Sequence, residues 1–275
     1  MEFNHPVGDY HVHPDFSIDA EGTLREYCQK AIELGLAEIV FTTHVDSNPA
    51  SEDWHKIIID GRKQPVTTDN LKIYQDAVTE LISGNDPVPI AVRCGVELEY
   101  HPEVKDSFLK MVADLNFDFV LGAVHFVDGA LLTIEEDVQR LLDKYSAVEL
   151  IEEYCKIVQQ ACQIKIFDSL AHLDIYRRIG HKLFPEEAAR IDYEFLDETL
   201  EQLVKCGLPI EVNTSGIRHG IGDWYPSKPL LHKARQANVL IGGLGSDAHA
   251  PDQLAVDFEM AHLIVHETFP KMHED

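Results

Sequence analysis

The chain has 275 residues, of which 45% are hydrophobic, which suits one large globular domain, and we expect residues 1–275 to form it. No apolar run approaches the roughly 20 residues that span a bilayer, and the N-terminal segment lacks the pattern of a secretory signal, so we expect a cytoplasmic protein without a membrane partner. The formal net charge of −25 repels polyanions, and no stripe of lysine and arginine offers a track for nucleic acid.

Short apolar runs alternate with longer amphipathic stretches along the whole chain. We expect strands at about 10–13, 39–43, 90–96, 119–124, 168–171, 209–212 and 239–244. We expect helices at about 23–34, 70–83, 103–115, 135–144, 148–164, 193–205, 230–237 and 251–266. Residues 45–68 contain two prolines and a glycine, and we expect a long loop over an opening. This alternation predicts an α/β fold with mostly parallel strands.

Metal-competent side chains stand at the ends of the expected strands. His11 and His13 lie two residues apart on the first strand, so both imidazoles face the same side. The candidates at later strand ends are His44, Glu97, His125, His172, Asp247 and His249. In a closed βα barrel the parallel strands end on one rim, so these side chains should converge in space. The alternative is a set of unconnected surface and core residues.

Asp19 lies in the loop above the first strand and is either a further ligand or a cap of the helix that begins near Thr23. With Asp19 the donors are too many for one tetrahedral ion, and they suit two or three divalent ions with shared ligands. Glu97 is the best bridge, because a carboxylate can give one oxygen to each of two ions. Zinc, iron and manganese all fit imidazole and carboxylate ligands. Two such ions about 3.5–4 Å apart can clamp both oxygens of a phosphoryl displacement.

Three arginines near the expected rim suit a phosphate. Arg177 and Arg178 follow His172 closely, and Arg218 follows the sixth strand. The planar guanidinium group matches the oxygens of a phosphate. We expect Arg177 and Arg218 to bind it, and the alternative for each arginine is an ion pair with a surface carboxylate. Glu99, two residues after Glu97, is expected in a loop.

Seven segments in the chain resemble, in order, the motifs of one known family. They are His-Val-His at 11–13, Thr-Thr-His-Val-Asp at 42–46, Gly-Val-Glu-Leu-Glu at 95–99, Gly-Ala-Val-His at 122–125, Ala-His-Leu-Asp at 171–174, Glu-Val-Asn-Thr-Ser-Gly-Ile-Arg at 211–218 and Gly-Ser-Asp-Ala-His at 245–249. The chain thus resembles the PHP (polymerase and histidinol phosphatase) superfamily, and within it the histidinol-phosphate phosphatases. The resemblance implies a distorted, TIM-like (β/α)7 barrel with a trinuclear metal centre.

The resemblance also implies how the ligands divide among the ions. One ion would take His11, His13, Glu97 and Asp247, a second Asp19, His44 and His249, and a third Glu97, His125 and His172. Two positions depart from the family pattern. Thr43 stands where the family usually has an acidic residue, and Asp19 stands where the phosphatase branch often has histidine.

We therefore expect a metal-dependent phosphomonoesterase that acts on a small phosphorylated substrate, with catalytic roles for Glu97, Asp247 and His249. By resemblance the substrate is L-histidinol phosphate, an intermediate of histidine biosynthesis. The alternatives are a PHP phosphoesterase for another small phosphate ester or a nucleotide, a catalytically silent metal-binding barrel, and a metal hydrolase of C–N bonds. The sequence leaves the oligomeric state open.

Overall fold

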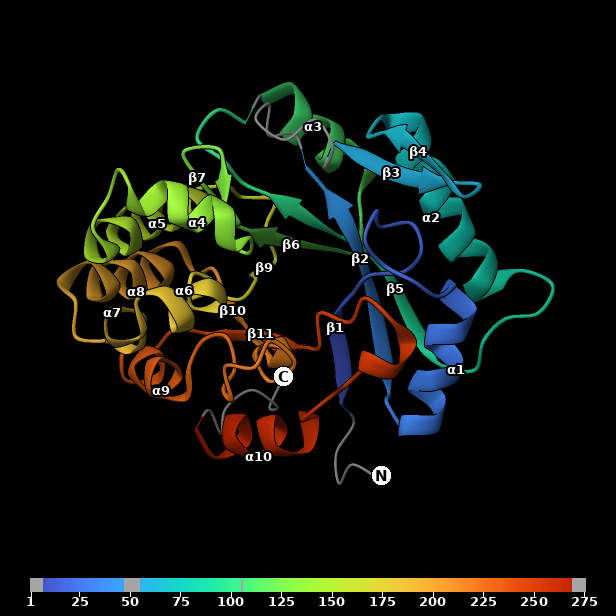
Figure 1. Ribbon diagram of the computed structural model, residues 1–275. Coiled ribbons are helices and arrows are strands. Elements are labelled where there is room, and N and C mark those ends of the chain that lie inside the picture. The colour runs from blue at the N-terminus through green and yellow to red at the C-terminus, as the bar shows by residue number, and fades with distance from the viewer. Residues whose placement is uncertain (1–6, 47–54, 105, 269–275) are drawn as a thin grey trace.

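A barrel of parallel strands is the centre of the computed structural model, which describes residues 7–46, 55–104 and 106–268 (Figure 1). Its seven strands follow the order β1-β2-β5-β6-β9-β10-β11, and every neighbouring pair in that order is parallel. They are β1 (Gly8–Val12), β2 (Glu38–Val45), β5 (Ala91–Glu99), β6 (Phe119–Ala123), β9 (Ser169–Leu170), β10 (Ile210–Asn213) and β11 (Ile241–Gly245). The α/β barrel expected from the sequence is thereby confirmed.

The first and last strands meet at the seam of the barrel. Val12 forms a parallel bridge with Ala248, just after β11, and the backbone N–H of His13 donates to the carbonyl of Ala248 at 2.8 Å. Asp9 also spans the seam, because its carboxylate accepts the backbone N–H of Ser246 at 2.9 Å. The barrel is therefore nearly closed, and residues at opposite ends of the sequence become neighbours.

Helices cover the outside of this barrel (Figure 1). They are α1 (Leu24–Leu34), α2 (Thr68–Ser83), α3 (Asp106–Leu115), α4 (Glu135–Leu142), α5 (Ala147–Ala161), α6 (Arg177–Leu183), α7 (Pro185–Ala189), α8 (Glu194–Cys206), α9 (Lys228–Gln236) and α10 (Phe258–Thr268). Among the described helices none is long and apolar enough to cross a membrane.

Local sequence signals explain several helix ends. Thr23 caps α1 in a capping box with Glu26, as the spacing of the two residues predicts. Gly35 and Gly207 end α1 and α8 in the left-handed conformation, which glycine adopts without a steric penalty. These ends fix the length of each helix and so the point at which the next strand enters the barrel.

Two layers of apolar side chains support the strand ends. The larger core lies between the barrel and its helices. A smaller cluster of Val40, Phe119, Leu121, Ala123 and Ala171 is contributed by β2, β6 and the residue after β9, with Tyr10 packed against it. The polar strand ends therefore project from a packed apolar base, which restricts their movement.

The structure corrects several expected elements. Within residues 45–68, β3 (Lys56–Ile59) and β4 (Arg62–Pro65) form an antiparallel hairpin, so the expected long loop is wrong there, and residues 47–54 lie outside the described part. The helices α6 and α7 and the small hairpin of β7 (Phe126–Val127) and β8 (Ala130–Leu131) were not expected. The expected helix at 251–266 is a short 3-10 turn, Pro251–Gln253, followed by α10.

Candidate metal centre

Imidazoles and carboxylates from three strands, β1, β5 and β11, converge in one buried set, which we call the first inner group. Its members are His11, His13, Glu97 and Asp247. The Nε2 atom of His11 lies 3.4 Å from Glu97 Oε1 and 3.6 Å from Asp247 Oδ1. The Nε2 atom of His13 lies 3.6 Å from Glu97 Oε2 and 3.4 Å from Asp247 Oδ1. The spacing suits a single ion between these four side chains.

Glu97 also belongs to a second inner group, together with His125 and His172. Its Oε1 atom lies 3.0 Å from His172 Nε2 and 3.7 Å from His125 Nε2. Glu97 lies inside β5 and not just after it, and its carboxylate faces both inner groups. This is the placement that a bridging carboxylate needs.

The outer group consists of Asp19, His44 and His249. The Nε2 atoms of His44 and His249 lie 3.4 Å apart, and each lies 3.5 Å from a carboxylate oxygen of Asp19. His13 adjoins this set, since its ring centroid lies 4.1 Å from that of His44 and 4.2 Å from that of His249. All nine residues expected as ligands are therefore brought together at one end of the barrel.

Several buried polar atoms at this centre lack a hydrogen-bond partner among the residues that the structure describes. They are His11 Nε2, His13 Nε2, Glu97 Oε2 and His172 Nδ1. Buried polar atoms in native proteins are nearly always satisfied, so unpaired atoms in one place require an explanation. Divalent cations explain three of the four, because His11 Nε2, His13 Nε2 and Glu97 face the centres of the groups that could hold an ion. The residues present thus fit the ions that the resemblance implies.

Carboxylates behind the imidazoles fix their orientation. Glu211 Oε1 lies 2.7 Å from His11 Nδ1, and Glu99 Oε2 lies 2.6 Å from His125 Nδ1. Glu211 also accepts the backbone N–H of His172 at 2.9 Å, so one carboxylate ties β1 and β9 to β10. Such partners set the tautomer of the ring and make it a more basic ligand.

Gly245 makes room for one of these pairs. A Cβ atom at this position would lie 1.8 Å from Glu211 Oε1 and 2.7 Å from His11 Cβ. No side chain fits so close to the two groups, so glycine is required for the Glu211–His11 contact. This explains why β11 ends in a glycine beside β1.

Hydroxyl groups take the place of a carboxylate behind His13. The Nδ1 atom of His13 lies 3.3 Å from Ser17 Oγ, which lies 2.9 Å from Thr43 Oγ1. Ser17 Oγ also accepts the backbone N–H of His44 at 3.2 Å. The departure at Thr43 therefore leaves His13 with a neutral partner, in contrast to His11 and His125.

The electrostatic environment keeps the ligand carboxylates ionised. Burial alone would raise the pKa of Glu97, but the imidazoles of His11 and His44 outweigh burial and hold it well below its usual value. Asp247 behaves in the same way, since His11 and His13 outweigh its burial and lower its pKa. Burial, together with nearby imidazoles, lowers the pKa of His13 far below its usual value and that of His125 to about 3. Neutral rings of this kind have the free lone pair that a metal ligand needs.

Two of the candidate ligands have unusual backbone conformations. The φ angles of His172 and Asp247 are 25° and 53°, in the left-handed region that few residues other than glycine occupy. Strain of this kind persists only where the surrounding structure enforces it, and it is concentrated at functional sites. The conformation turns both side chains toward Glu97 and His11.

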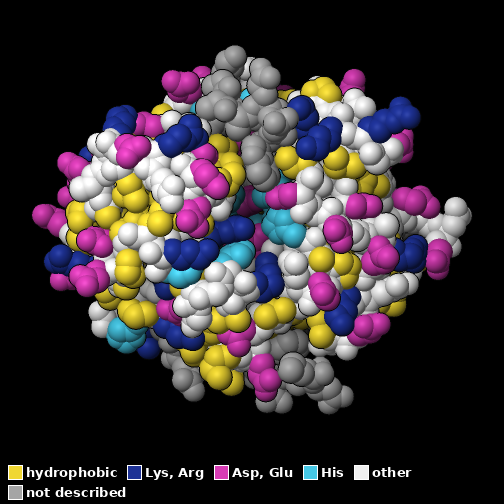
Figure 2. Space-filling model, viewed as in Figure 1, with side chains coloured by type: hydrophobic (Ala, Val, Ile, Leu, Met, Phe, Trp, Pro, Cys, Tyr) yellow, Lys and Arg dark blue, Asp and Glu magenta, His cyan; other side chains and the backbone are white. Residues whose placement is uncertain are grey.

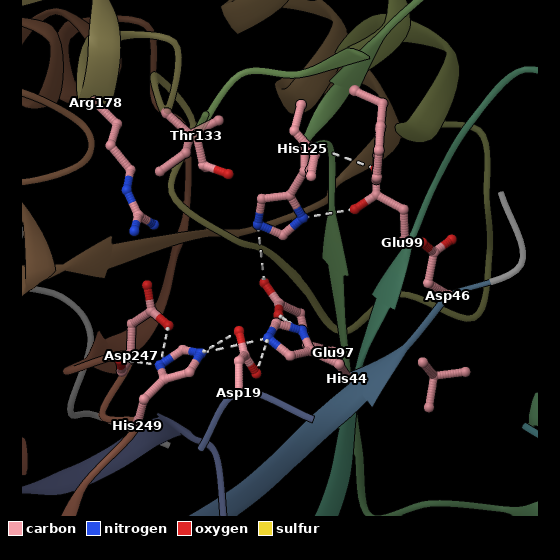
Figure 3. A pocket seen from close by; sticks show the side chains of 14 residues that line it. Asp19, His44, Asp46, Glu97, Glu99, His125, Thr133, Arg178, Asp247 and His249 are labelled. Carbon is pink, nitrogen blue, oxygen red and sulfur yellow. Dashed lines mark hydrogen bonds and ion pairs between the residues drawn. The ribbon is translucent and has the colours of Figure 1, made fainter. Parts of the chain in front are cut away.

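A pocket opens over these groups (Figure 3). Its walls are formed by Asp19, His44, Val45, Asp46, Glu97, Glu99, His125, Phe126, Leu131, Thr133, Ile175, Arg178, Asp247 and His249. Histidine and acidic side chains lie at the bottom of a hollow near the centre of the face shown in Figure 2. Glu99 is the last residue of β5 and not part of a loop, and it is one of the wall residues that sequence reasoning did not assign to the site.

The structure changes which arginines face this pocket. Arg178 extends into it from α6, and within the described part of the chain its guanidinium has no hydrogen bond or ion pair (Figure 3). Arg177 is buried elsewhere, where it donates to the Trp224 carbonyl at 2.8 Å and to Asp174 at 3.2 Å. Arg177, which was expected to bind phosphate, therefore does not face the pocket, whereas Arg178 does.

Arg218 lies behind Asp247 and not in the wall of the pocket. Its two terminal nitrogens donate to the carbonyls of Ser246 and Asp247, both at 2.7 Å. Burial, with a contribution from the nearby charge of Arg178, lowers its pKa below the ordinary arginine value. Arg218 thus holds the strained turn that carries Asp247, and its charge lies close to that of Arg178.

The fold and the site together define an α/β barrel with a candidate metal centre at the carboxyl ends of its strands. The model of the PHP domain matches residues 9–215, and the chain belongs to this family. Three similar proteins show the extent of the likeness.

A Deinococcus radiodurans protein named "Probable histidinol-phosphatase" is 27% identical over 250 residues, which are 91% of this chain and 89% of that protein. The Bacillus subtilis protein named "Histidinol-phosphatase" is 26% identical over 269 residues. The match covers 91% of this chain and 96% of that protein. The crystal structure of a Lactococcus lactis histidinol phosphate phosphatase, complexed with zinc, L-histidinol and phosphate, matches with a TM-score of 0.71 at 22% identity, over 96% of this chain and 94% of that one. At that identity the match establishes the fold alone.

Proposed function

We propose that the protein is a metal-dependent phosphomonoesterase that hydrolyses L-histidinol phosphate to L-histidinol and phosphate. The observation that carries this proposal is the guanidinium of Arg178, which reaches into the pocket above the converging imidazoles and carboxylates and has no partner among the residues that the structure describes. In a protein of net charge −25, a partly buried cation with no acidic partner among the described residues is suited to an anionic ligand.

Each side chain of the pocket has a defined task in this reaction. Divalent ions, when bound, supply Lewis acidity and lower the pKa of water toward ~7. The two inner groups and the outer group hold these ions, and Glu97 lies between the inner groups. Arg178 binds the non-bridging phosphate oxygens and stabilises the charge that they carry in the transition state. Arg218 fixes the turn of Asp247, and Asp247 and His249 line the same pocket as Arg178 (Figure 3).

The substrate is inferred from two further observations. Two relatives that match this chain over most of its length are named "Probable histidinol-phosphatase" and "Histidinol-phosphatase". In the pocket, Asp46 and Glu99 lie side by side on the wall away from Arg178 (Figure 3). A substrate with a phosphate at one end and an ammonium group at the other matches this separation of charge.

The test is a phosphate-release panel with protein that has been stripped of metal and reloaded with zinc or manganese. We expect kcat/KM for L-histidinol phosphate to exceed that for an aryl phosphate and for nucleoside monophosphates by at least about 100-fold. The Glu97→Gln variant should lose activity toward every substrate. Equal rates for histidinol phosphate and the aryl phosphate would refute the substrate, and no release from any ester would refute the reaction class.

Other expectations accompany this proposal as predictions. We predict two or three divalent ions, which are zinc, iron or manganese. We also predict catalytic roles for Glu97, Asp247 and His249, and a single domain that comprises residues 1–275. The remaining predictions are a cytoplasmic location, a role in histidine biosynthesis and the lack of a nucleic-acid partner.

A further inference from the structure

We propose that the outer group binds its ion more weakly than the two inner groups, so that this ion is the last to bind and the first to leave. The inference rests on the metal centre of the proposed function and concerns the order in which that centre fills. Three features of Asp19, His44 and His249 support it.

The first feature is exposure to solvent. Among the inner ligands, the side chains of His11, His13, Glu97 and His172 are at most 2% exposed, that of Asp247 is 9% exposed and that of His125 is 17% exposed. Those of His44, His249 and Asp19 are 15%, 25% and 35% exposed. Water competes more effectively for an ion at the exposed set, and it screens the attraction between the ion and its ligands.

The second feature is the charge available to the ion. Glu97 and Asp247 face the first inner group, Glu97 also faces the second, and a further carboxylate supports each group, since Glu211 and Glu99 lie behind the rings of His11 and His125. The outer group has one carboxylate of its own, that of Asp19.

The support behind the outer rings is weaker as well. The Nδ1 atom of His249 lies 2.9 Å from the backbone carbonyl of Asp247 and 3.5 Å from Asp247 Oδ1, a carboxylate that the first inner group also uses. His44 Nδ1 lies 2.8 Å from Glu97, but that carboxylate also serves both inner groups. Carboxylate support typically changes metal affinity about 10- to 100-fold.

The third feature is the way the ligands are anchored. The inner ligands lie on strands or within two residues of a strand end. Asp19 lies in the irregular segment between β1 and α1, which contains turns but neither helix nor strand. The hydrogen bonds and ion pairs of its carboxylate run to His44 and His249, both within the outer group. A small movement of this segment removes the only carboxylate of the outer group without disturbing the barrel.

The test is a titration of metal-free protein with zinc, in competition with a chelator of known affinity and in the absence of substrate. We expect at least two affinity classes, with the last ion bound at least tenfold more weakly than the others. Asp19→Asn should weaken or abolish the last step alone, and His249→Gln should do the same by removing a second ligand. Glu211→Gln should instead weaken a tight step.

Asp15→Asn is the matched control, because it removes the same charge from the same segment but lies in a groove beside α1 and α2, away from the metal centre. It should leave every step unchanged. A single affinity for all ions, or a loss of a tight step in Asp19→Asn, would overturn the inference. Because the titration needs no substrate, protein that binds zinc in two classes but releases no phosphate would refute the proposed function and leave this inference standing.

Discussion

Two adjacent residues at the start of a helix can face different surroundings and therefore have different roles. Arg177 and Arg178 both open α6, yet the first is buried against the segment after β10 and the second reaches the pocket. The difference is one of direction, since successive residues of a helix point about 100° apart. The roles of both arginines can be tested separately.

Arg178→Ala should lower kcat/KM for the phosphate ester about 100-fold, because a charged donor to the phosphate is lost from a water-poor pocket. The thermal stability should stay within about 1 °C of that of the unaltered protein, since no ion pair within the described residues is broken. Steady-state kinetics and a melting curve measure the two quantities. Arg190→Ala, which removes an exposed arginine paired with Asp192, is the control. Activity equal to that of this control would contradict the role of Arg178.

His219 supplies a prediction about pH. Burial, together with the charge of Arg178, lowers the pKa of His219 to about 4, below the ordinary value of 6.5 that the unfolded chain would have. The unfolded state therefore binds a proton first, so this residue contributes stability above about pH 6.5, and the contribution is lost as the pH falls through about 4. His219→Gln should reduce the loss of unfolding free energy between pH 7 and pH 4.5 in denaturant titrations. The same change at the exposed His232 should leave the pH dependence as it was.

At the scale of the elements, α6 is held to the barrel through Arg177. Its guanidinium joins the buried Asp174 to Asp223 and to the Trp224 carbonyl, and so connects the segments that follow β9 and β10. The pair with Asp174 is nearly inaccessible to water, since the two side chains are 9% and 1% exposed. Loss of the arginine would leave a buried carboxylate without its cation, which is costly.

Arg177→Ala should therefore lower the free energy of unfolding by about 3–5 kcal/mol, as measured by urea denaturation. Activity should also fall, because the same helix positions Arg178. A loss below about 1 kcal/mol, similar to that of an exposed arginine, would show that the network does not anchor α6.

The strand-end ligands were predictable for an elementary reason. In a parallel barrel an apolar run stops where the strand leaves the core, so the next polar residues lie on the rim, as His125 and His172 do. The choice between Arg177 and Arg178 was not predictable, because the periodicity gave no sign of α6 and the direction of each side chain depends on it. Glu211 was missed although a signal existed, since a charged residue inside an otherwise apolar strand requires a buried partner.

At the scale of the whole molecule, the metal centre is built from nearly every part of the barrel. Ligands come from the ends of β1, β2, β5, β6, β9 and β11, so an ion at any of the three groups connects strands that are distant in sequence. Bound ions therefore stabilise the entire fold and not one loop.

Removal of the ions with a chelator should lower the melting temperature by roughly 10 °C, the size expected when ligands at about 1,000 times their dissociation constants are withdrawn from a chain of this length. Calorimetry with and without added zinc measures this shift. Glu97→Gln should show a much smaller response, because it disables both inner groups. An unchanged melting temperature would argue against tight binding at the centre.

The seam of the barrel has a consequence for biosynthesis. His11 and His13 are synthesised well before Asp247 and His249, which follow the last strand of the barrel. A nascent chain therefore carries an incomplete set of donors until this strand and the turn after it have been made, and metallation has to wait for them. A stalled or shortened product that ends before β11 would lack the turn of Asp247 altogether, so cells would make it as an inactive polypeptide with poor retention of zinc.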